Sequence, residues 1–200
     1  MAFIHTRTKS VQIKIVYYGP AMAGKTANLI YIYNQLRQRV SAQLLTISAY
    51  DDQTLFFDFL SFGLNDVQGF DIKIRLYSVP GRSHFDAIRK TLLKGADGVV
   101  FVADASAMRK TNILSLKNLQ TDLEANRLDI RRIPLVLQFN KSDLAEQGTL
   151  LLPKAILLSD LNSQLQKPYF QASAVQGLNV LATLKQIVTQ TIASIENRAR

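Results

Sequence analysis

The 200-residue sequence contains no cysteine and only two histidines, His5 and His84. Without cysteine, the chain has no disulfide framework, no thiolate metal ligand and no cysteine nucleophile. Two histidines are too few for a multi-histidine metal centre. The composition therefore excludes disulfide scaffolds and metal sites built on cysteine or on several histidines.

Long hydrophobic runs are also missing, since no apolar stretch approaches the roughly 18 residues of a membrane span. The first residues, Met-Ala-Phe-Ile-His, lack the layout of a signal peptide and a myristoylation glycine, and residues 197–200 lack a prenylation cysteine. With 48% hydrophobic and 20% charged residues, the composition suits one globular domain over residues 1–200. We therefore expect a cytoplasmic, single-domain protein with no lipid anchor.

Acidic residues are absent from the first quarter of the chain, and the first one in the sequence is Asp51. Over the whole sequence, 24 Lys and Arg against 15 Asp and Glu give a net charge of +9. The basic residues of the first quarter are Arg7, Lys9, Lys14, Lys25, Arg37 and Arg39. They could form a patch for nucleic acid, an anionic membrane or an acidic protein, or a solvated surface with one phosphate-binding lysine. Because they form no run and have no interleaved aromatics, nucleic-acid binding is the minor hypothesis.

Apolar periodicity predicts six strands and about five helices in alternation. The strands are expected at 11–18, 55–62, 70–79, 98–103, 134–139 and 169–172, and the helices at 25–40, 84–94, 112–126, 153–165 and 178–195. Residues 64–69 are expected to be the turn of a hairpin. This order favours an α/β fold with a mostly parallel sheet covered on both faces. Ligands of such sheets bind at the carboxyl ends of the strands.

The first strand is followed by Gly-Pro-Ala-Met-Ala-Gly-Lys-Thr at residues 19–26, which matches the phosphate-loop pattern G-x-x-x-x-G-K-[ST]. Such a loop turns several backbone N–H groups toward phosphate oxygens, and the start of the helix adds its positive end. Lys25 would reach the β- and γ-phosphates, and the Thr26 hydroxyl would bind Mg²⁺. The predicted phosphate-binding residues are Gly19, Ala21, Met22, Ala23, Gly24, Lys25, Thr26 and Ala27.

The fifth strand is followed by Asn-Lys-Ser-Asp at residues 140–143. The Asp143 carboxylate can accept two hydrogen bonds from the N1–H and 2-amino groups of guanine, whereas adenine offers neither donor. Lys141 can lie over the base and ribose, and Asn140 can tie this segment to the phosphate loop. After the last strand come Ser173, Ala174 and Val175, where a backbone N–H could meet the guanine 6-oxo group.

These motifs make the chain resemble a small Ras-like GTPase, and more narrowly the bacterial MglA group of polarity and gliding-motility GTPases. The resemblance covers nearly the whole chain. Its matching stretches are residues 14–20, 54–60, 79–81, 93–104 and 140–143, of which Thr-Leu-Phe-Phe-Asp-Phe at 54–59 is specific to the group. The resemblance implies the Ras-like fold, GTP and GDP binding with Mg²⁺, and switching between the two nucleotide states. It also implies a roadblock-type, MglB-like activator and effectors at a cell pole.

Carried over by this resemblance, Thr54 would contact Mg²⁺ and the γ-phosphate, and Gly81 would be the glycine of the second switch segment. The generic D-x-x-G motif reads Ser78-Val79-Pro80-Gly81 here, so no carboxylate stands at its first position. The MglA group also has a hydroxyl residue there. Asp58 is our candidate substitute, against the alternative of an ordinary solvent-facing strand residue.

Three residues depart from the family at the hydrolysis machinery: Ala21 replaces a glycine, Gln53 a catalytic arginine and Arg82 a water-positioning glutamine. Either Gln53 and Arg82 have exchanged roles, or hydrolysis is impaired because arginine cannot accept a hydrogen bond from water. Ala21 favours slow hydrolysis, since its methyl group would crowd the γ-phosphate. His84 lies two positions too far along to replace the water-positioning histidine of translation-factor GTPases, which directly follows the glycine.

We therefore expect a monomeric GTP-binding switch that hydrolyses GTP slowly or with an activator, with recruitment to a cell pole implied by the resemblance. The alternative is a hydrolysis-deficient scaffold held in one nucleotide state. A nucleic-acid-associated GTPase is the third hypothesis and has only the net charge in its favour.

Overall fold

The computed structural model describes residues 3–5, 10–38, 43–47, 57–67, 70–81 and 85–199 of the chain. Within these residues eight strands form one sheet in the order β3-β4-β5-β2-β6-β7-β8, with β1 paired to β2. The strands are β1 Phe3–His5, β2 Ser10–Tyr18, β3 Gln43–Ile47, β4 Phe57–Val67, β5 Phe70–Ser78, β6 Gly98–Asp104, β7 Leu135–Asn140 and β8 Tyr169–Gln171. The five strands from β5 to β8 in this order are mutually parallel, and β1, β3 and β4 pair antiparallel. The expectation of a mostly parallel α/β sheet is confirmed.

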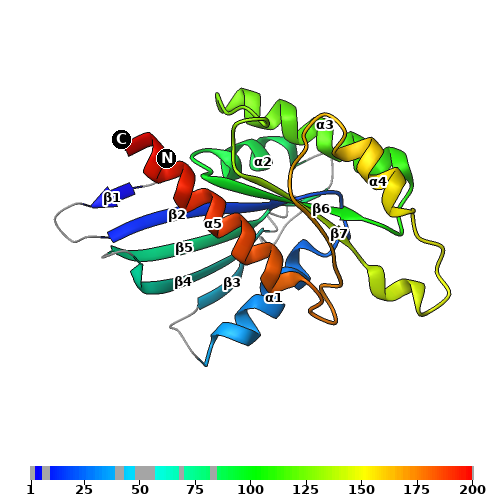
Figure 1. Cartoon of the computed structure of the whole chain (residues 1–200), viewed down its shortest axis with the longest axis horizontal. Helices are drawn as coiled ribbons and strands as arrows, with labels where there is room; N and C mark the ends of the chain where they lie inside the picture. The colour runs from blue at the N-terminus through cyan, green and yellow to red at the C-terminus, as the bar shows by residue number, and fades with distance from the viewer. Residues whose placement is uncertain are drawn as a thin grey trace.

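Five α-helices cover the two faces of the sheet (Figure 1). They are α1 Lys25–Leu36, α2 Asp86–Leu93, α3 Arg109–Ala125, α4 Lys154–Leu161 and α5 Val180–Ala199. One buried cluster joins α2, α3 and α4 to the strand residues Val16, Phe101 and Leu137. The other cluster joins α1 and α5 to strand residues that are adjacent in sequence to these three and point to the opposite face of the sheet. Successive strand residues point to opposite faces, so central strands with both faces covered are apolar throughout.

The predicted number of six strands is wrong, because the described residues also include β1 and β3. Both strands are short and pair only at the margin of the sheet. β3 has the sequence Gln-Leu-Leu-Thr-Ile, with Gln43 and Leu45 exposed. Edge strands with one exposed face carry a weak apolar signal, which is why periodicity does not reveal them.

The predicted hairpin is present, but its turn is shorter than expected. β4 continues to Val67, through most of the 64–69 segment expected to be a turn, and Val67 pairs with Phe70. The register shifts between Leu64 and Val67, as at a β-bulge. Asn65 and Asp66 therefore belong to an irregular strand end instead of the predicted turn.

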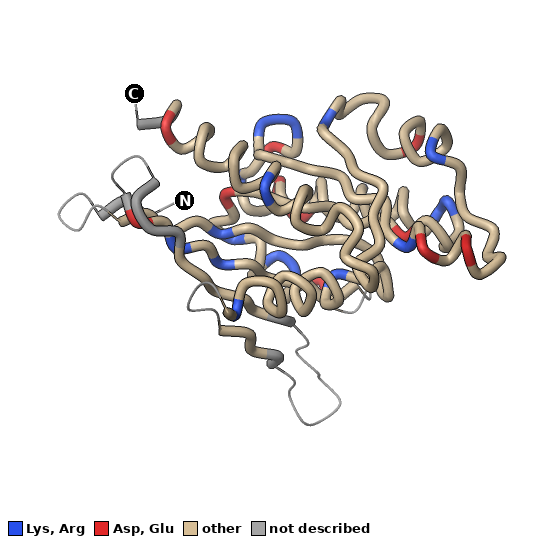
Figure 2. Tube along the Cα trace, turned by 60° about the horizontal axis from the view of Figure 1, so that its bottom comes forward, with Lys and Arg blue, Asp and Glu red and all other residues tan. Residues whose placement is uncertain are grey.

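The basic residues of the first quarter do not form one patch where the structure describes them. Lys14 lies on β2, with its Nζ 2.9 Å from the Lys94 carbonyl oxygen, Lys25 is buried at the start of α1, and Arg37 follows the end of α1. Figure 2 shows Lys and Arg distributed over strands, helices and loops. Arg7, Lys9 and Arg39 lie outside the described residues. This distribution favours the solvated-surface interpretation over a nucleic-acid platform.

Among the described residues, no helix is both long enough and apolar enough to cross a membrane.

Candidate nucleotide-binding site

The phosphate-loop sequence forms the connection between β2 and α1, as its motif predicts. β2 ends at Tyr18 and α1 begins at Lys25, with Gly24 as the residue before the helix. Gly24 has φ +93°, a left-handed conformation that glycine adopts without strain. Lys25 is 6% exposed, and its Nζ donates to the carbonyl oxygens of Gly19 at 3.0 Å and Pro20 at 2.6 Å. The ammonium group is therefore held inside the curl of the loop, where a phosphate group would sit.

Gly81 lies directly against this loop. A Cβ atom built on Gly81 would come within 2.2 Å of the Ala21 backbone nitrogen and 2.5 Å of the Ala21 Cα. No side chain fits in this space, so only glycine allows the segment after β5 to approach the loop so closely. Ala21 and Gly81, two predicted site residues, are thus adjacent.

Asn140, at the end of β7, ties the predicted base-reading segment to the phosphate loop. Its Nδ2 donates to the Ala23 carbonyl oxygen at 2.7 Å, and its Oδ1 accepts from the Ala174 backbone N–H at 2.8 Å. One buried amide therefore joins three segments that are far apart in sequence. The tie between Asn140 and the phosphate loop, expected from the sequence, is present.

The contact between Asn140 and Ala174 bears on the expectation that a backbone N–H of residues 173–175 meets the guanine 6-oxo group. Ser173 and Ala174 are buried and Val175 is 80% exposed. The Ala174 N–H, one of the candidate donors to the guanine oxygen, donates to Asn140 in this structure.

Lys141 and Asp143 follow Asn140 in a tight turn. Lys141 has φ +74°, and its Nζ donates to Asp104 Oδ2 at 2.7 Å. Asp143 belongs to the 3₁₀ helix Ser142–Ala145 and is 9% exposed. The sequence motifs alone do not identify Asp104 as a residue of the site. Its position at the carboxyl end of β6, beside β7, was the available signal.

The arrangement fits a nucleoside phosphate bound with Mg²⁺. A buried lysine stands in a curled loop at a helix start, and a buried carboxylate, Asp143, follows the strand that is tied to that loop. The described residues contain no group of three or more His, Asp or Glu that could hold a metal ion. Mg²⁺ is ordinarily held by few protein ligands together with phosphate oxygens and water, which suits the Thr26 hydroxyl.

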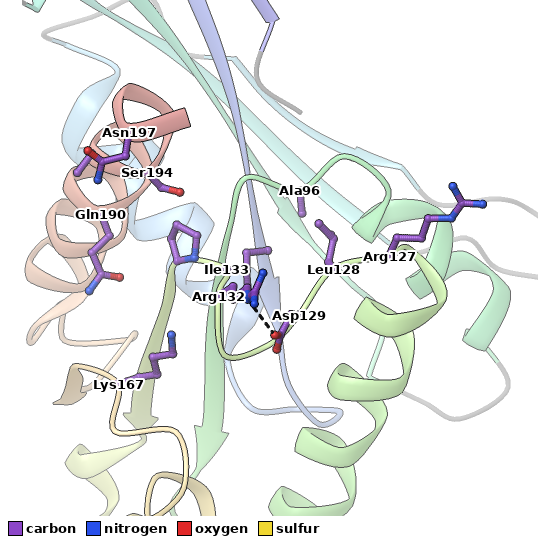
Figure 3. Close-up of a pocket in the computed structure, with 12 residues that line it drawn as sticks. Ala96, Arg127, Leu128, Asp129, Arg132, Ile133, Lys167, Gln190, Ser194 and Asn197 are labelled. Carbon is purple, nitrogen blue, oxygen red and sulfur yellow. Dashed lines mark ion pairs between the residues drawn. The ribbon is translucent and has the colours of Figure 1, made fainter. Parts of the chain in front are cut away.

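Two hollows flank the sheet at opposite ends. One, of about 610 Å³, lies beside the phosphate loop and is lined by Tyr18, Gly81, Arg89 and α3. The other, of about 910 Å³, lies at the amino ends of β6 and β7, lined by Ala96, Pro134 and the last turns of α5 (Figure 3). The larger hollow contains none of the predicted site residues, so volume alone does not locate the site.

The geometry agrees with comparisons to known proteins. A model of the Ras family matches residues 14–193, which is nearly the whole chain. The chain belongs to the Ras family.

The Mutual gliding-motility protein MglA of Myxococcus xanthus is 40% identical over 200 residues, covering 98% of each chain. More distant Ras-family relatives include the Ras-related protein RABG3c of Arabidopsis thaliana, 22% identical over 189 residues with 92% and 84% of the two chains covered. Ras-related protein Rab7 of Gossypium hirsutum is 23% identical over 186 residues, covering 90% and 82%. Within the Ras family, the chain is an MglA-like small GTPase.

The first position of the D-x-x-G motif is occupied by Ser78, which is the last residue of β5. The side chain is 4% exposed. In the antiparallel pairing of β4 and β5, Asp58 is the residue directly opposite Ser78. The backbone register therefore places Asp58, the candidate substitute, opposite the motif position that lacks a carboxylate.

Four residues singled out from the sequence, Gln53, Thr54, Arg82 and His84, lie outside the described residues. Their roles in this Ras-family protein stay predictions.

Proposed function

We propose that this protein is a guanine-nucleotide switch that binds GTP and GDP with Mg²⁺ and hydrolyses GTP slowly. The observation that carries the proposal is the buried contact of Lys25 with the Gly19 and Pro20 carbonyl oxygens, in a loop fastened by Asn140 to the segment holding Asp143. Membership of the Ras family supports the general activity of a GTP hydrolase. The relative named for mutual gliding motility supports a role in cell motility.

Each predicted residue has a distinct task in this proposal. Lys25 neutralises the β- and γ-phosphates, and the N–H groups at the start of α1 complete the phosphate site. Thr26 and Thr54 supply protein ligands to Mg²⁺, which would offset charge on the phosphates when bound. Asp143 accepts the two donors of guanine, and Lys141 lies beside the base and ribose.

Slow, activator-dependent hydrolysis follows from the residues around the γ-phosphate position. Catalysis of phosphoryl transfer depends mostly on positioning and on electrostatic stabilisation. Ala21 places a methyl group where the family has none, and Gln53 and Arg82 stand in interchanged positions. We propose that a roadblock-type partner accelerates the reaction and that effectors recruit the monomeric, cytoplasmic protein to a cell pole.

Isothermal titration calorimetry tests nucleotide binding directly. With Mg²⁺ present, we expect heat on adding GDP or GTP and none on adding ATP. Lys25→Ala should abolish binding of GTP because the buried ammonium is lost. Asp143→Asn should weaken GTP binding at least tenfold, since an amide cannot accept from both guanine donors. Absence of heat with both guanine nucleotides in the wild-type protein contradicts the proposal.

A second candidate function is a scaffold held permanently in one nucleotide state, which the departures from the family at Ala21, Gln53 and Arg82 together favour. The nucleotide that co-purifies with the protein gives a first indication of turnover. Retained GTP indicates slow or absent hydrolysis, and GDP indicates turnover. Single-turnover hydrolysis at ordinary enzymatic rates eliminates the scaffold.

A further inference from the structure

A chain of buried polar side chains runs beneath the nucleotide site. Gln138 lies on β7 within Leu-Val-Leu-Gln-Phe, where the other four residues are all apolar, and it is 0% exposed. Its Nε2 donates to Asn28 Oδ1 at 3.0 Å and to Thr183 Oγ1 at 3.2 Å. Asn28 belongs to α1 and Thr183 to α5, and both are 0% exposed. One amide therefore connects a central strand to the two helices that cover this face of the sheet.

This series of buried polar side chains ends at the phosphate loop. Asn28 Nδ2 donates to the Gly24 carbonyl oxygen at 2.9 Å, directly before Lys25. Because side chains alternate along a strand, Gln138 and Asn140 share one face of β7. Asn140 binds the Ala23 carbonyl oxygen. Two side chains of one strand thus hold consecutive carbonyl groups of the loop, Ala23 directly and Gly24 through Asn28.

Stability alone does not require these polar groups. Apolar side chains of the same shape can replace a hydrogen-bonded pair with little change in stability. The Gln138 Oε1 atom is buried and has no hydrogen-bond partner among the described residues, which is unfavourable. What the amides add is direction, since hydrogen bonds fix distance and angle where apolar packing allows sliding.

We propose that Asn28, Gln138 and Thr183 form a buried brace that holds the phosphate loop in fixed register with the base-reading strand and thereby slows nucleotide release. The three are positioning residues, because none lies at a nucleotide contact. Release requires the phosphate loop and the base-reading segment to loosen their hold together. A brace between them makes that movement less favourable. The inference rests on the proposed nucleotide binding and adds a determinant of its kinetics.

Two threonines of α5 provide a matched test. Thr183 and Thr191 are both 0% exposed, and each hydroxyl donates to the carbonyl oxygen four residues earlier at 2.7 Å, Asn179 and Ile187 respectively. The difference is that Thr183 also accepts from Gln138. Valine has nearly the shape of threonine, so Thr183→Val and Thr191→Val remove equivalent hydroxyl groups from the same helix. Only the first removes a member of the brace.

Release of a fluorescent GDP analogue into excess GDP, with Mg²⁺ present, measures the effect. Loss of one buried hydrogen bond predicts about fivefold faster release from Thr183→Val, and no change from Thr191→Val. Gln138→Leu should accelerate release by about tenfold or more, because both bonds are lost. Equal release rates from Thr183→Val and Thr191→Val overturn the brace.

A second readout separates positioning from general destabilisation. The double variant Asn28→Leu, Gln138→Leu replaces both partners with apolar groups, so its denaturant midpoint should return toward that of the wild type while release stays fast. Recovery of slow release together with the midpoint contradicts a positioning role. Wild-type protein is measured alongside. If it does not bind the GDP analogue, the proposed function itself fails, whereas normal wild-type binding with unchanged variants refutes only the brace.

Discussion

Arg89 on α2 forms a buried ion pair with Asp122 on α3, with Nε 3.2 Å from Oδ2 and side chains 4% and 2% exposed. The Tyr18 hydroxyl donates to the same carboxylate oxygen at 2.7 Å. Tyr18 is the last residue before the phosphate loop, and α2 follows the segment of Gly81. One carboxylate therefore joins α2, α3 and β2, the strand that ends at the phosphate loop.

Removing that carboxylate should strongly destabilise the fold. We expect Asp122→Ala to lower the free energy of unfolding by about 3–5 kcal/mol, because the Arg89 Nε and the Tyr18 hydroxyl both lose their buried charged acceptor, while Arg89 keeps its ion pair with Asp86 at 2.6 Å. Urea denaturation monitored by circular dichroism measures the change. Arg132→Ala is the control, since Arg132 is 90% exposed and 3.7 Å from Asp129, and it should leave the unfolding midpoint unchanged. A loss below about 1 kcal/mol for Asp122→Ala contradicts this account of the pair.

Two adjacent tyrosines should respond oppositely to loss of the hydroxyl group. Tyr17 is 0% exposed, and its hydroxyl has no hydrogen-bond partner among the described residues. Tyr17→Phe should therefore stabilise the protein by about 1 kcal/mol, whereas Tyr18→Phe, which removes a bond to Asp122, should destabilise it by about 1.5–3 kcal/mol. The same urea titration reports both. Destabilisation by both variants argues that the Tyr17 hydroxyl has a partner in solution.

Stability should fall at alkaline pH. Burial raises the pKa of Tyr17 and Tyr18 well above the ordinary value of 10.0, and the hydrogen bond to Asp122 raises that of Tyr18 further. Above pH 10 the unfolded state loses these protons and the folded state keeps them, so the stabilisation present below pH 10 is lost as pH rises. The expected slope is about 1.4 kcal/mol per pH unit for each tyrosine. Urea midpoints between pH 9 and 11.5 test this, and each phenylalanine variant should remove about half of the slope.

Exchanging Gln53 and Arg82 should raise the rate of GTP hydrolysis. We expect Gln53→Arg combined with Arg82→Gln to raise the single-turnover rate of GTP hydrolysis, because it returns an arginine and a glutamine to the family's positions. Ala21→Gly, made separately, measures the effect of the methyl group in the loop. A neutral or harmful effect of the double exchange shows instead that the two residues have traded roles.

Much of this fold is readable from the sequence where the physical signal is local. The run Gly-Val-Val-Phe-Val-Ala predicts β6, because a strand covered on both faces is apolar at every position. The phosphate loop is equally evident, since its glycines and lysine serve backbone geometry and charge within eight residues. β1 and β3 cannot be predicted from the local sequence pattern, because an edge strand forms through pairing with a neighbouring strand that lies elsewhere in the sequence. The end of β4 was missed for the same reason.

The sequence by itself determined the layered α/β fold, the phosphate-loop motif and the candidate acid for the base, Asp143, because each depends on neighbours along the chain. Only the tertiary structure decided which distant side chains meet. It placed Asn140 on Ala23, Asp104 on Lys141 and Gln138 between Asn28 and Thr183. Such contacts depend on strand order and on register, which bring together residues more than thirty positions apart and leave no local pattern.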